Sequence, residues 1–187
     1  MQQFTPQDIT LRVHTRKHGL LSKIAHDLCF ETTVVDLEVR SDGSGRARID
    51  PMVIQLLGAE RDGVVDRGLL SLTDQRRVLA NLRQDVLDVR RHPQIAYDWT
   101  ELHVTGAQVC VEGRLRLHGA ERPMTLRGTI TAGRVRFTVT LDQREFGIKP
   151  FSAALGALRV RPELEIEISL PFDAIAAATG PAGLSVG

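Results

Sequence analysis

Residues 113–148 read GRLRLHGAERPMTLRGTITAGRVRFTVTLDQREFGI, and this stretch decides the fold. Apolar side chains occupy every second position through three successive segments, and arginine or threonine fills most positions between them. Because successive side chains of a β-strand point to opposite faces, this alternation predicts three strands with one dry and one wet face. Short Gly-containing connections at 119–123 and 132–133 are typical of turns. The stretch therefore predicts an antiparallel meander that covers its apolar face by closing on itself or by stacking on a second sheet.

The same alternation predicts further strands on both sides of this meander. In the long strand expected at 28–40, the apolar face switches near Val34, which predicts a bulge or a strong twist. The Gly- and charge-rich segment 58–68 is predicted to be a loop. The full set of expected strands is 9–13, 28–40, 46–57, 95–101, 107–117, 123–130, 134–142 and 158–170.

Residues 73–88 change to a helical period and predict one amphipathic helix. Its N-cap is expected at Thr73, its polar face includes Arg83, and Pro93 marks the stop. In a chain that is otherwise mainly β, this helix is expected to pack across the open end or the flank of the sheet. Its expected apolar face consists of Val78, Leu79, Leu82, Val86 and Leu87.

Length and composition predict one domain over residues 1–187, with a core at about 9–170 and a C-terminal tail at 171–187. Hydrophobic residues make up 42% of the chain, enough for a sizeable core, and no Pro/Ser-rich linker divides it. The formal charge is only +1 and aromatic residues make up 4%. Neither a basic patch nor a base-stacking platform is expected from these values, so nucleic acid is not a predicted partner.

Residues 1–8 lack both a basic region and a continuous apolar run, so a secretory signal is not predicted. The expected location is therefore the cytoplasm. No run of about 18 consecutive apolar residues occurs, so a membrane-spanning helix is not predicted either.

Candidate groups for chemistry are few. His14 and His18 have the four-residue spacing that brings two metal ligands together on a helix, but they fall in a predicted strand-to-loop region, where this spacing has no such meaning. Cys29 and Cys110 lie inside predicted strands and are expected to be small buried apolar residues rather than a disulfide or redox pair. Neither a metal site nor a cofactor is predicted.

Three segments resemble, in order, the sequence pattern of the YceI-like family. Residues 115–126 resemble its strand, His-Gly turn and strand, residues 143–148 (QREFGI) its signature of an Arg shortly followed by Phe-Gly-Ile, and residues 86–95 the segment that precedes them. The resemblance runs from about residue 9 to residue 170. It implies a lipocalin-like antiparallel barrel whose apolar interior holds, in characterised relatives, a long isoprenoid lipid.

The chain departs from the commoner family pattern in two places. Residues 72–78 read LTDQRRV where that pattern has an Arg-Asp pair followed by a His-Leu segment. Near the N-terminus, residues 18–28 resemble a variant in which a His-Asp-Leu element opens the second strand. Many relatives are exported, so the absence of a predicted signal is a further difference, unless the sequence is that of a mature form. These departures indicate a divergent branch.

Together, these observations predict a mainly β protein: a single antiparallel lipocalin-like β-barrel of about eight strands with one amphipathic α-helix packed on it. A barrel of this size either fills with its own side chains or leaves room for one small ligand. The leading hypothesis is a non-catalytic carrier for a long apolar molecule, an isoprenoid lipid or an isoprenoid quinone. The expected partner is thus an apolar small molecule or lipid, and a homodimer is compatible with the sequence.

Two alternatives stay open. One is an enzyme that acts on an apolar substrate with His26 and Asp27 at the barrel mouth, and the other is a ligand-free stress or interaction protein with a filled barrel. His26 is expected to hydrogen-bond a ligand head group there, or else to be merely exposed while Asp27 pairs with a backbone amide. Arg144 is expected to bind a carboxylate across the barrel, and Gly147 to allow a positive φ. The predicted ligand-binding residues are Leu11, Val13, Leu115, Leu117, Met124, Leu126, Val135, Phe137, Val139, Phe146, His26 and Arg144.

Overall fold

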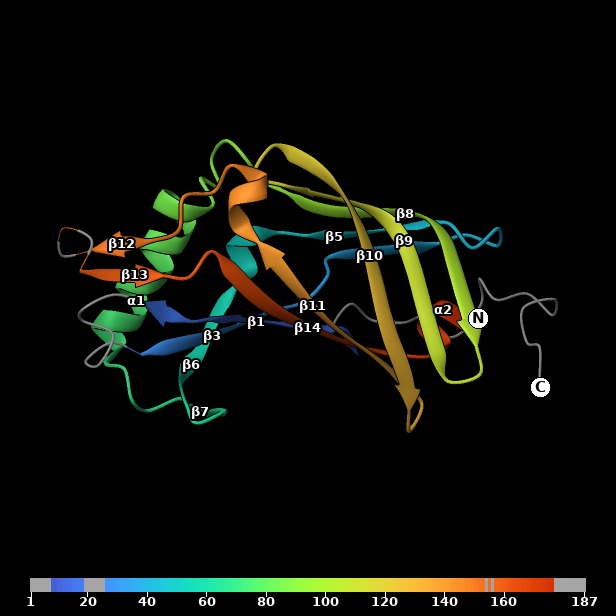
Figure 1. Cartoon of the computed structure of the whole chain (residues 1–187), viewed down its shortest axis with the longest axis horizontal. Coiled ribbons are helices and arrows are strands. Elements are labelled where there is room, and N and C mark those ends of the chain that lie inside the picture. The colour runs from blue at the N-terminus through green and yellow to red at the C-terminus, as the bar shows by residue number, and fades with distance from the viewer. Residues whose placement is uncertain (1–7, 19–25, 154, 156, 177–187) are drawn as a thin grey trace.

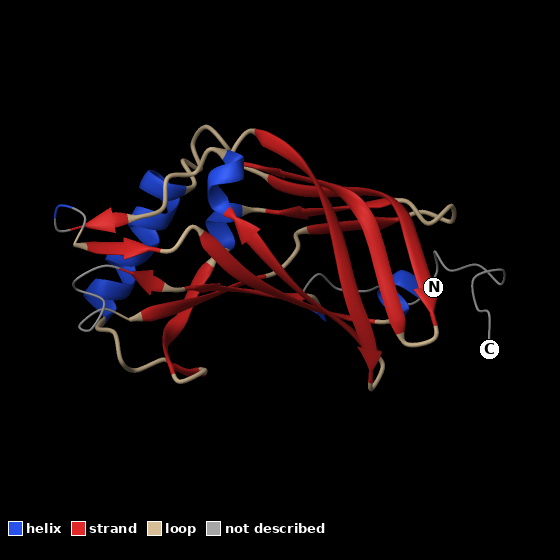
Figure 2. Ribbon diagram, viewed as in Figure 1, coloured by secondary structure: helices blue, strands red, loops and turns tan. Residues whose placement is uncertain are grey.

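The computed structural model describes residues 8–18, 26–153, 155 and 157–176. Long antiparallel strands curl into one large sheet, and helical segments cover parts of it (Figure 1 and Figure 2). The strands of this sheet are β1 Thr10–Thr15, β3 Asp27–Thr32, β4 Asp36–Val39, β5 Gly45–Ile49, β6 Gln55–Arg61, β7 Val64–Asp66, β8 Ile95–Thr105, β9 Gln108–Leu117, β10 Ala120–Thr131, β11 Arg134–Asp142 and β14 Glu163–Pro171. A small second sheet has the order β12-β13-β2, with bounds Ser152–Ala153, Leu158–Val160 and Lys17–His18.

The large sheet has the order β4-β5-β8-β9-β10-β11-β14-β1-β3-β6-β7. Its two ends come together because β3–β4 and β5–β6 are the two arms of one long hairpin. β4 pairs with β5 next to the turn, and β3 pairs with β6 farther along the same two arms. If each arm is counted as one bent strand and β7 is left aside, eight strands surround the interior: β1, β3–β4, β5–β6, β8, β9, β10, β11 and β14. This arrangement confirms the predicted mainly β, antiparallel architecture.

The meander predicted from residues 113–148 is present as β9, β10 and β11. Leu117 pairs with Ala120 across the first turn, where His118 and Gly119 have positive φ values of 51° and 78°. Gly128 pairs with Phe137 on the next two strands, and an added Cβ at Gly128 would overlap the Phe137 ring. Alternation predicts these strands well because one face of each is packed against the interior.

Three strands were predicted to be continuous, and each is interrupted in the structure. The strand expected at 28–40 is two strands, since residues 33–35 separate β3 from β4. The strand expected at 46–57 is broken by the 3₁₀ turn Pro51–Val53, whose N-cap Asp50 accepts a hydrogen bond from the Met52 amide. The strand expected at 158–170 divides into β13 and β14.

The loop expected at 58–68 was also wrong, because β6 and β7 form a hairpin there. Asp62 and Gly63 adopt φ values of 52° and 77° at its turn. These are the left-handed conformations that a two-residue hairpin connection requires. The high glycine and charge content of this segment thus belongs to a hairpin whose turn, residues 61–64, is exposed and whose first residues, 58–60, are buried.

The predicted helix is present, but its boundaries and geometry differ. Helix α1 spans Leu72–Asn81, and its N-cap is Ser71 rather than Thr73, because the Ser71 hydroxyl accepts a hydrogen bond from the Asp74 amide. The chain continues into a π-helical turn at Leu82–Val86. Figure 1 shows α1 at the same end of the barrel as β12 and β13.

The prediction that Arg83 lies on the polar face of this helix was wrong. Its Nη2 donates hydrogen bonds to the carbonyl oxygens of Met52 and Ile54, at 2.9 and 3.2 Å. The guanidinium therefore fastens the helical segment to the 3₁₀ turn between β5 and β6.

Buried side chains form two clusters within the sheet. The larger includes Trp99, Phe137 and Val135, and the smaller includes Leu117, Phe146 and Ile148. Cys29 is fully buried and free, and burial raises the pKa of its thiol to about 11, whereas free Cys110 is only half-buried. The C-terminal segment adds the short helix α2, Asp173–Ala176, and residues 177–187 lie outside the described residues.

Candidate functional site

The curled sheet encloses a cavity of about 490 Å³ with an apolar wall. A volume of this size falls within the range of roughly 300–1,000 Å³ that is usual for small-molecule pockets. The inward faces therefore do not fill the barrel, which argues against the packed-core alternative.

The side chains that form the cavity wall come from every second position of each strand. On β1 the cavity is lined by Leu11, Val13 and Thr15, and on β3 by Leu28 and Phe30, always at every second position. Leu28 pairs with Thr15 and Phe30 with Val13, so neighbouring strands present the same face to the interior.

The helical segment closes part of the same cavity. The cavity is lined by Val78 of α1 and by Leu82, Val86 and Leu87 of the following turn, whereas Leu79 is not among the lining residues. The apolar face predicted for this helix is thus directed into the cavity at four of its five residues.

Two aromatic side chains on β8, Tyr97 and Trp99, line the cavity, and their polar atoms are bonded to the backbone. The Tyr97 hydroxyl lies 3.1 and 3.0 Å from the carbonyl oxygens of Val111 and Met124, and Trp99 Nε1 donates to the carbonyl oxygen of Gly43 at 3.0 Å. The two rings are stacked, with centroids 6.0 Å apart, and burial raises the pKa of Tyr97. Because their polar atoms already have backbone partners, these side chains present mainly ring surface to a guest.

Nine of the twelve residues predicted to bind ligand lie on the cavity wall. They are Leu11, Val13, His26, Leu115, Leu117, Met124, Leu126, Phe137 and Val139. Their contact with a ligand stays a prediction, but the structure brings them together around one space.

The other three predicted residues, Val135, Phe146 and Arg144, stand outside the described lining. Val135 is fully buried and Phe146 is 2% exposed, and both belong to the packed clusters. The positive φ of 73° expected for Gly147 is present.

Arg144 does not reach across the barrel. Its Nη2 lies 2.6 Å from Oδ2 of Asp142, two residues earlier, and 3.8 Å from Oε1 of Glu163 on the paired strand β14. Hydrogen bonds from the Arg144 side chain and from the Arg144 amide hold the pKa of the Asp142 carboxyl below its usual value. Arg144 therefore stabilises the 3₁₀ turn Gln143–Phe146.

The two residues of the His26–Asp27 pair have different surroundings. His26 lines the cavity, whereas the Asp27 carboxylate accepts a hydrogen bond of 2.7 Å from the Lys17 amide and lies 3.8 Å from Arg16 Nη1. Each of the two predicted alternatives therefore describes one residue of this pair. Asp27 pairs with a backbone amide, and His26 lies on the cavity wall.

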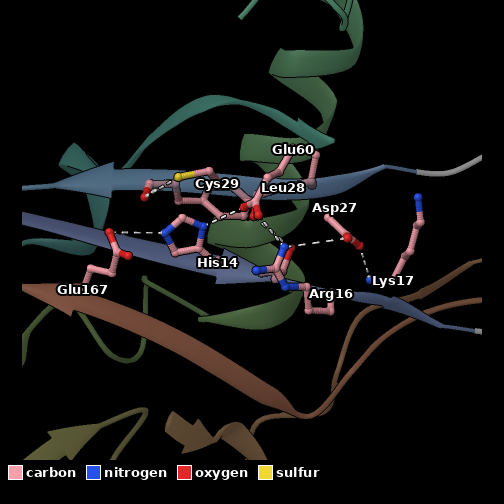
Figure 3. Close-up of polar contacts among 10 residues, drawn as sticks. His14, Arg16, Lys17, Asp27, Leu28, Cys29, Glu60 and Glu167 are labelled. Atoms are coloured by element: carbon pink, nitrogen blue, oxygen red, sulfur yellow. Dashed lines mark hydrogen bonds and ion pairs between the residues drawn. The ribbon is translucent and has the colours of Figure 1, made fainter. Parts of the chain in front are cut away.

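A buried polar cluster on the other face of these strands was missed by sequence reasoning. Figure 3 shows His14 between Glu60 and Glu167, with Arg16 on the far side of Glu60. His14 Nδ1 lies 2.7 Å from Glu60 Oε2, Arg16 Nη1 lies 2.5 Å from Glu60 Oε1, and His14 Nε2 lies 3.7 Å from Glu167 Oε2. Glu60 was hidden in the segment predicted to be a loop, so nothing in the sequence pointed to it.

The geometry of the described residues bears on metal binding and on membrane crossing. Within this part of the chain, His, Cys, Asp and Glu side chains do not gather in groups of three or more that could hold a metal ion. None of the helices among these residues has the length and apolar composition that a membrane-spanning helix requires.

Known proteins resemble this chain in both sequence pattern and fold. A family model described as the YceI-like domain matches residues 14–172. No curated protein sequence matches the chain. BcnA of Burkholderia cenocepacia has a similar structure, with a TM-score of 0.57 at 12% identity, over 89% of this chain and 98% of BcnA.

A second solved structure is a polyisoprenoid-binding domain from Saccharophagus degradans that is implicated in plant cell wall breakdown. Its TM-score is also 0.57, at 11% identity, over 86% of this chain and 91% of that domain. At such low identity, the structural similarity shows a shared fold only. The family model adds a sequence match over residues 14–172, which is most of the chain. With its strand, turn and strand motif inside that match and its barrel shared with these structures, the chain belongs to the YceI-like family.

Proposed function

We propose that this protein is a non-catalytic carrier that holds a long apolar molecule inside the barrel, either an isoprenoid lipid or a quinone with an isoprenoid tail. The observation that carries this proposal is the cavity of about 490 Å³ with its aliphatic and aromatic wall. Transfer of apolar surface from water to such a wall is favourable by roughly 25 cal/mol per Å². The polyisoprenoid-binding domain of Saccharophagus degradans, which has the same fold, supports this choice of ligand.

The enzyme alternative receives less support from the geometry. Catalysis by His26 and Asp27 would need both groups to face one substrate. His26 lines the cavity, whereas Asp27 is not among the lining residues and already contacts the Lys17 amide and Arg16. We therefore propose a binding role for His26 and a structural role for Asp27.

Native mass spectrometry of protein purified without detergent tests the carrier function, followed by organic extraction of any adduct. A stoichiometric apolar adduct that disappears on delipidation is expected. If the purified protein carries no adduct, and the delipidated protein also fails to take up both geranylgeraniol and geranylgeranyl phosphate, the carrier function is wrong. Fractionation of cells tests the cytoplasmic location, and size-exclusion chromatography tests the homodimer; both stay predictions.

A further inference from the structure

Two leucine side chains stand in the solvent at one end of the barrel. Leu72, the first residue of α1, is 71% exposed, and Leu155, between β12 and β13, is fully exposed. Figure 1 shows α1, β12 and β13 at the same end of the molecule. A single exposed leucine is ordinary on a folded protein, but two at one end of a lipid-sized cavity call for a physical reason.

Both leucines belong to segments that also form the cavity wall. Val78, on another side of α1 from Leu72, lines the cavity. Phe151 and Leu158, which flank Leu155 in the sequence, line it as well. Apolar side chains at this end therefore face both the interior of the barrel and the surrounding water.

The exposed side of α1 also carries positive charge. Arg76 lies one helical turn after Leu72, Arg77 follows it, and both are exposed. Among the residues that the structure describes, neither arginine enters an ion pair. Asp74, the acidic residue of the helix, is half-buried, and it accepts a hydrogen bond of 2.6 Å from the Ser71 hydroxyl.

Arginines on the outer wall of the barrel have a different arrangement. Arg114 and Arg116, on β9, both pair with the carboxylate of Glu121 on β10. These guanidinium groups thus find their counter-charge within the protein surface. Arg76 and Arg77 instead leave their charge available to an anion outside the protein.

An exposed leucine beside two unpaired arginines suits the surface of a bilayer. Interfacial binding combines apolar side chains that enter the head-group region with cations that attract anionic lipids. A protein partner would instead need a closely packed apolar centre, which two leucines on separate segments do not provide. The pattern of charge and exposure at this end therefore favours a membrane surface over a second protein.

We propose that the α1 end of the barrel docks on an anionic membrane surface. Leu72 and Leu155 enter the head-group region, and Arg76 and Arg77 contact lipid phosphates. This inference goes beyond the carrier function, because docking of this surface needs no guest in the cavity. Docking would also place the bilayer beside the segments that line one end of the cavity, where a water-insoluble guest can be exchanged.

Co-sedimentation with lipid vesicles at low salt tests the proposal on the full chain. One set of vesicles is phosphatidylcholine alone, and the other contains equal parts of phosphatidylcholine and phosphatidylglycerol. The variants are Leu72→Ser and the double substitution Arg76→Gln/Arg77→Gln. The matched control is Arg127→Gln/Arg136→Gln, which removes the same charge from exposed positions on β10 and β11.

Wild type is expected to bind the anionic vesicles and to bind phosphatidylcholine weakly or not at all. Arg76→Gln/Arg77→Gln should weaken anionic binding about 25-fold, since one arginine near such a surface contributes about fivefold. Leu72→Ser should also weaken it, by about fivefold or more, because less apolar surface enters the bilayer. The control Arg127→Gln/Arg136→Gln should change binding by less than about twofold, because charges far from the surface are screened.

Circular dichroism checks the fold of each variant, and Leu155→Ser carries the same expectation if Leu72→Ser does not fold. The proposal is wrong if wild type does not bind anionic vesicles, or if the two double substitutions weaken binding equally. It is also wrong if the protein stays off vesicles and forms a dimer that Leu72→Ser returns to monomer, since the surface is then a contact between two copies.

The carrier function is judged separately by the adduct seen in native mass spectrometry. A protein that carries a stoichiometric apolar adduct but does not bind anionic vesicles contradicts docking alone. A protein that binds these vesicles with the expected loss in Arg76→Gln/Arg77→Gln, yet neither carries nor takes up an apolar guest, contradicts the carrier function alone.

Discussion

Nδ1 of His14 lies 2.7 Å from Oε2 of Glu60, although the two residues belong to strands that are not neighbours. β1 and β6 each pair with β3, so this contact passes over β3 and ties three strands together. Arg16 joins the same carboxylate at 2.5 Å. Because the Glu60 side chain is only 5% exposed, these partners replace its hydration.

Glu60→Ala is expected to lower the free energy of unfolding by roughly 3 kcal/mol, because it leaves His14 and Arg16 without their shared carboxylate. Glu31→Ala is the matched control. It breaks the exposed 3.0 Å pair with Arg12 between the neighbouring strands β1 and β3, and it should cost less than about 1 kcal/mol. Urea unfolding measures both. Equal losses would show that the Glu60 cluster contributes no more than a surface pair.

The same carboxylate predicts a pH dependence. Burial by itself raises the pKa of Glu60, but hydrogen bonds from Arg16 and His14 outweigh it and hold the pKa below its ordinary value. A lowered folded-state pKa gives stability that is present above the unfolded value of about 4.3 and is lost as pH falls through the folded value. The stability difference between wild type and Glu60→Gln should therefore narrow as pH falls below about 4.3. A difference that stays constant from pH 7 to pH 3 would contradict this.

Tryptophan substitutions distinguish cavity from packed core. Leu117 and Leu126 line the cavity, so Leu117→Trp and Leu126→Trp should fold with less than about 1 kcal/mol lost relative to delipidated wild type, and should no longer copurify with an apolar ligand. Delipidated protein is the proper reference because bound ligand raises apparent stability. Val135→Phe is the control: Val135 is fully buried outside the cavity lining, so enlargement there should cost about 1–3 kcal/mol. If all three variants lose the same stability, the cavity positions are packed core.

The helical segment gives a further test. Leu82→Asp places a charge on the half-buried, apolar face that the segment turns to the cavity, and should lower stability by more than about 2 kcal/mol. Arg77→Asp, on the exposed side of α1, should change it by less than about 0.5 kcal/mol. Thermal unfolding of the two variants compares them. Identical melting temperatures would mean that this face does not hold the helix against the barrel.

Alternation makes much of this fold predictable. Where a strand has one buried face, residue spacing alone decides which side chains point inward, and it places Leu117, Leu126 and Phe137 correctly on the inner wall. The same argument fails for Val135. It follows the alternation of β11, but it lies near the end of the barrel strand, inside the packed cluster rather than beside the cavity.

What escaped prediction depends on contacts between distant residues or on local turn geometry. Arg144 could be chosen from its motif, but its pairing with Asp142 follows from the turn Gln143–Phe146. Glu60 and His14 are 46 residues apart and meet only through the strand order. The position of Lys17 on the cavity wall also escaped prediction, because a lysine in a predicted strand-to-loop region gives no sign that its face is the inward one.

The interruption of the closing hairpin has a consequence for the shape of the container. Between the pairs Glu31–Gln55 and Asp36–Arg48, both arms leave the strand conformation. The sheet is thus closed by two separate sets of ladder hydrogen bonds, one between β4 and β5 beside Tyr97 and Trp99 and the other between β3 and β6. A bulkier guest therefore presses against two short ladders joined by irregular backbone rather than against one continuous pair of strands.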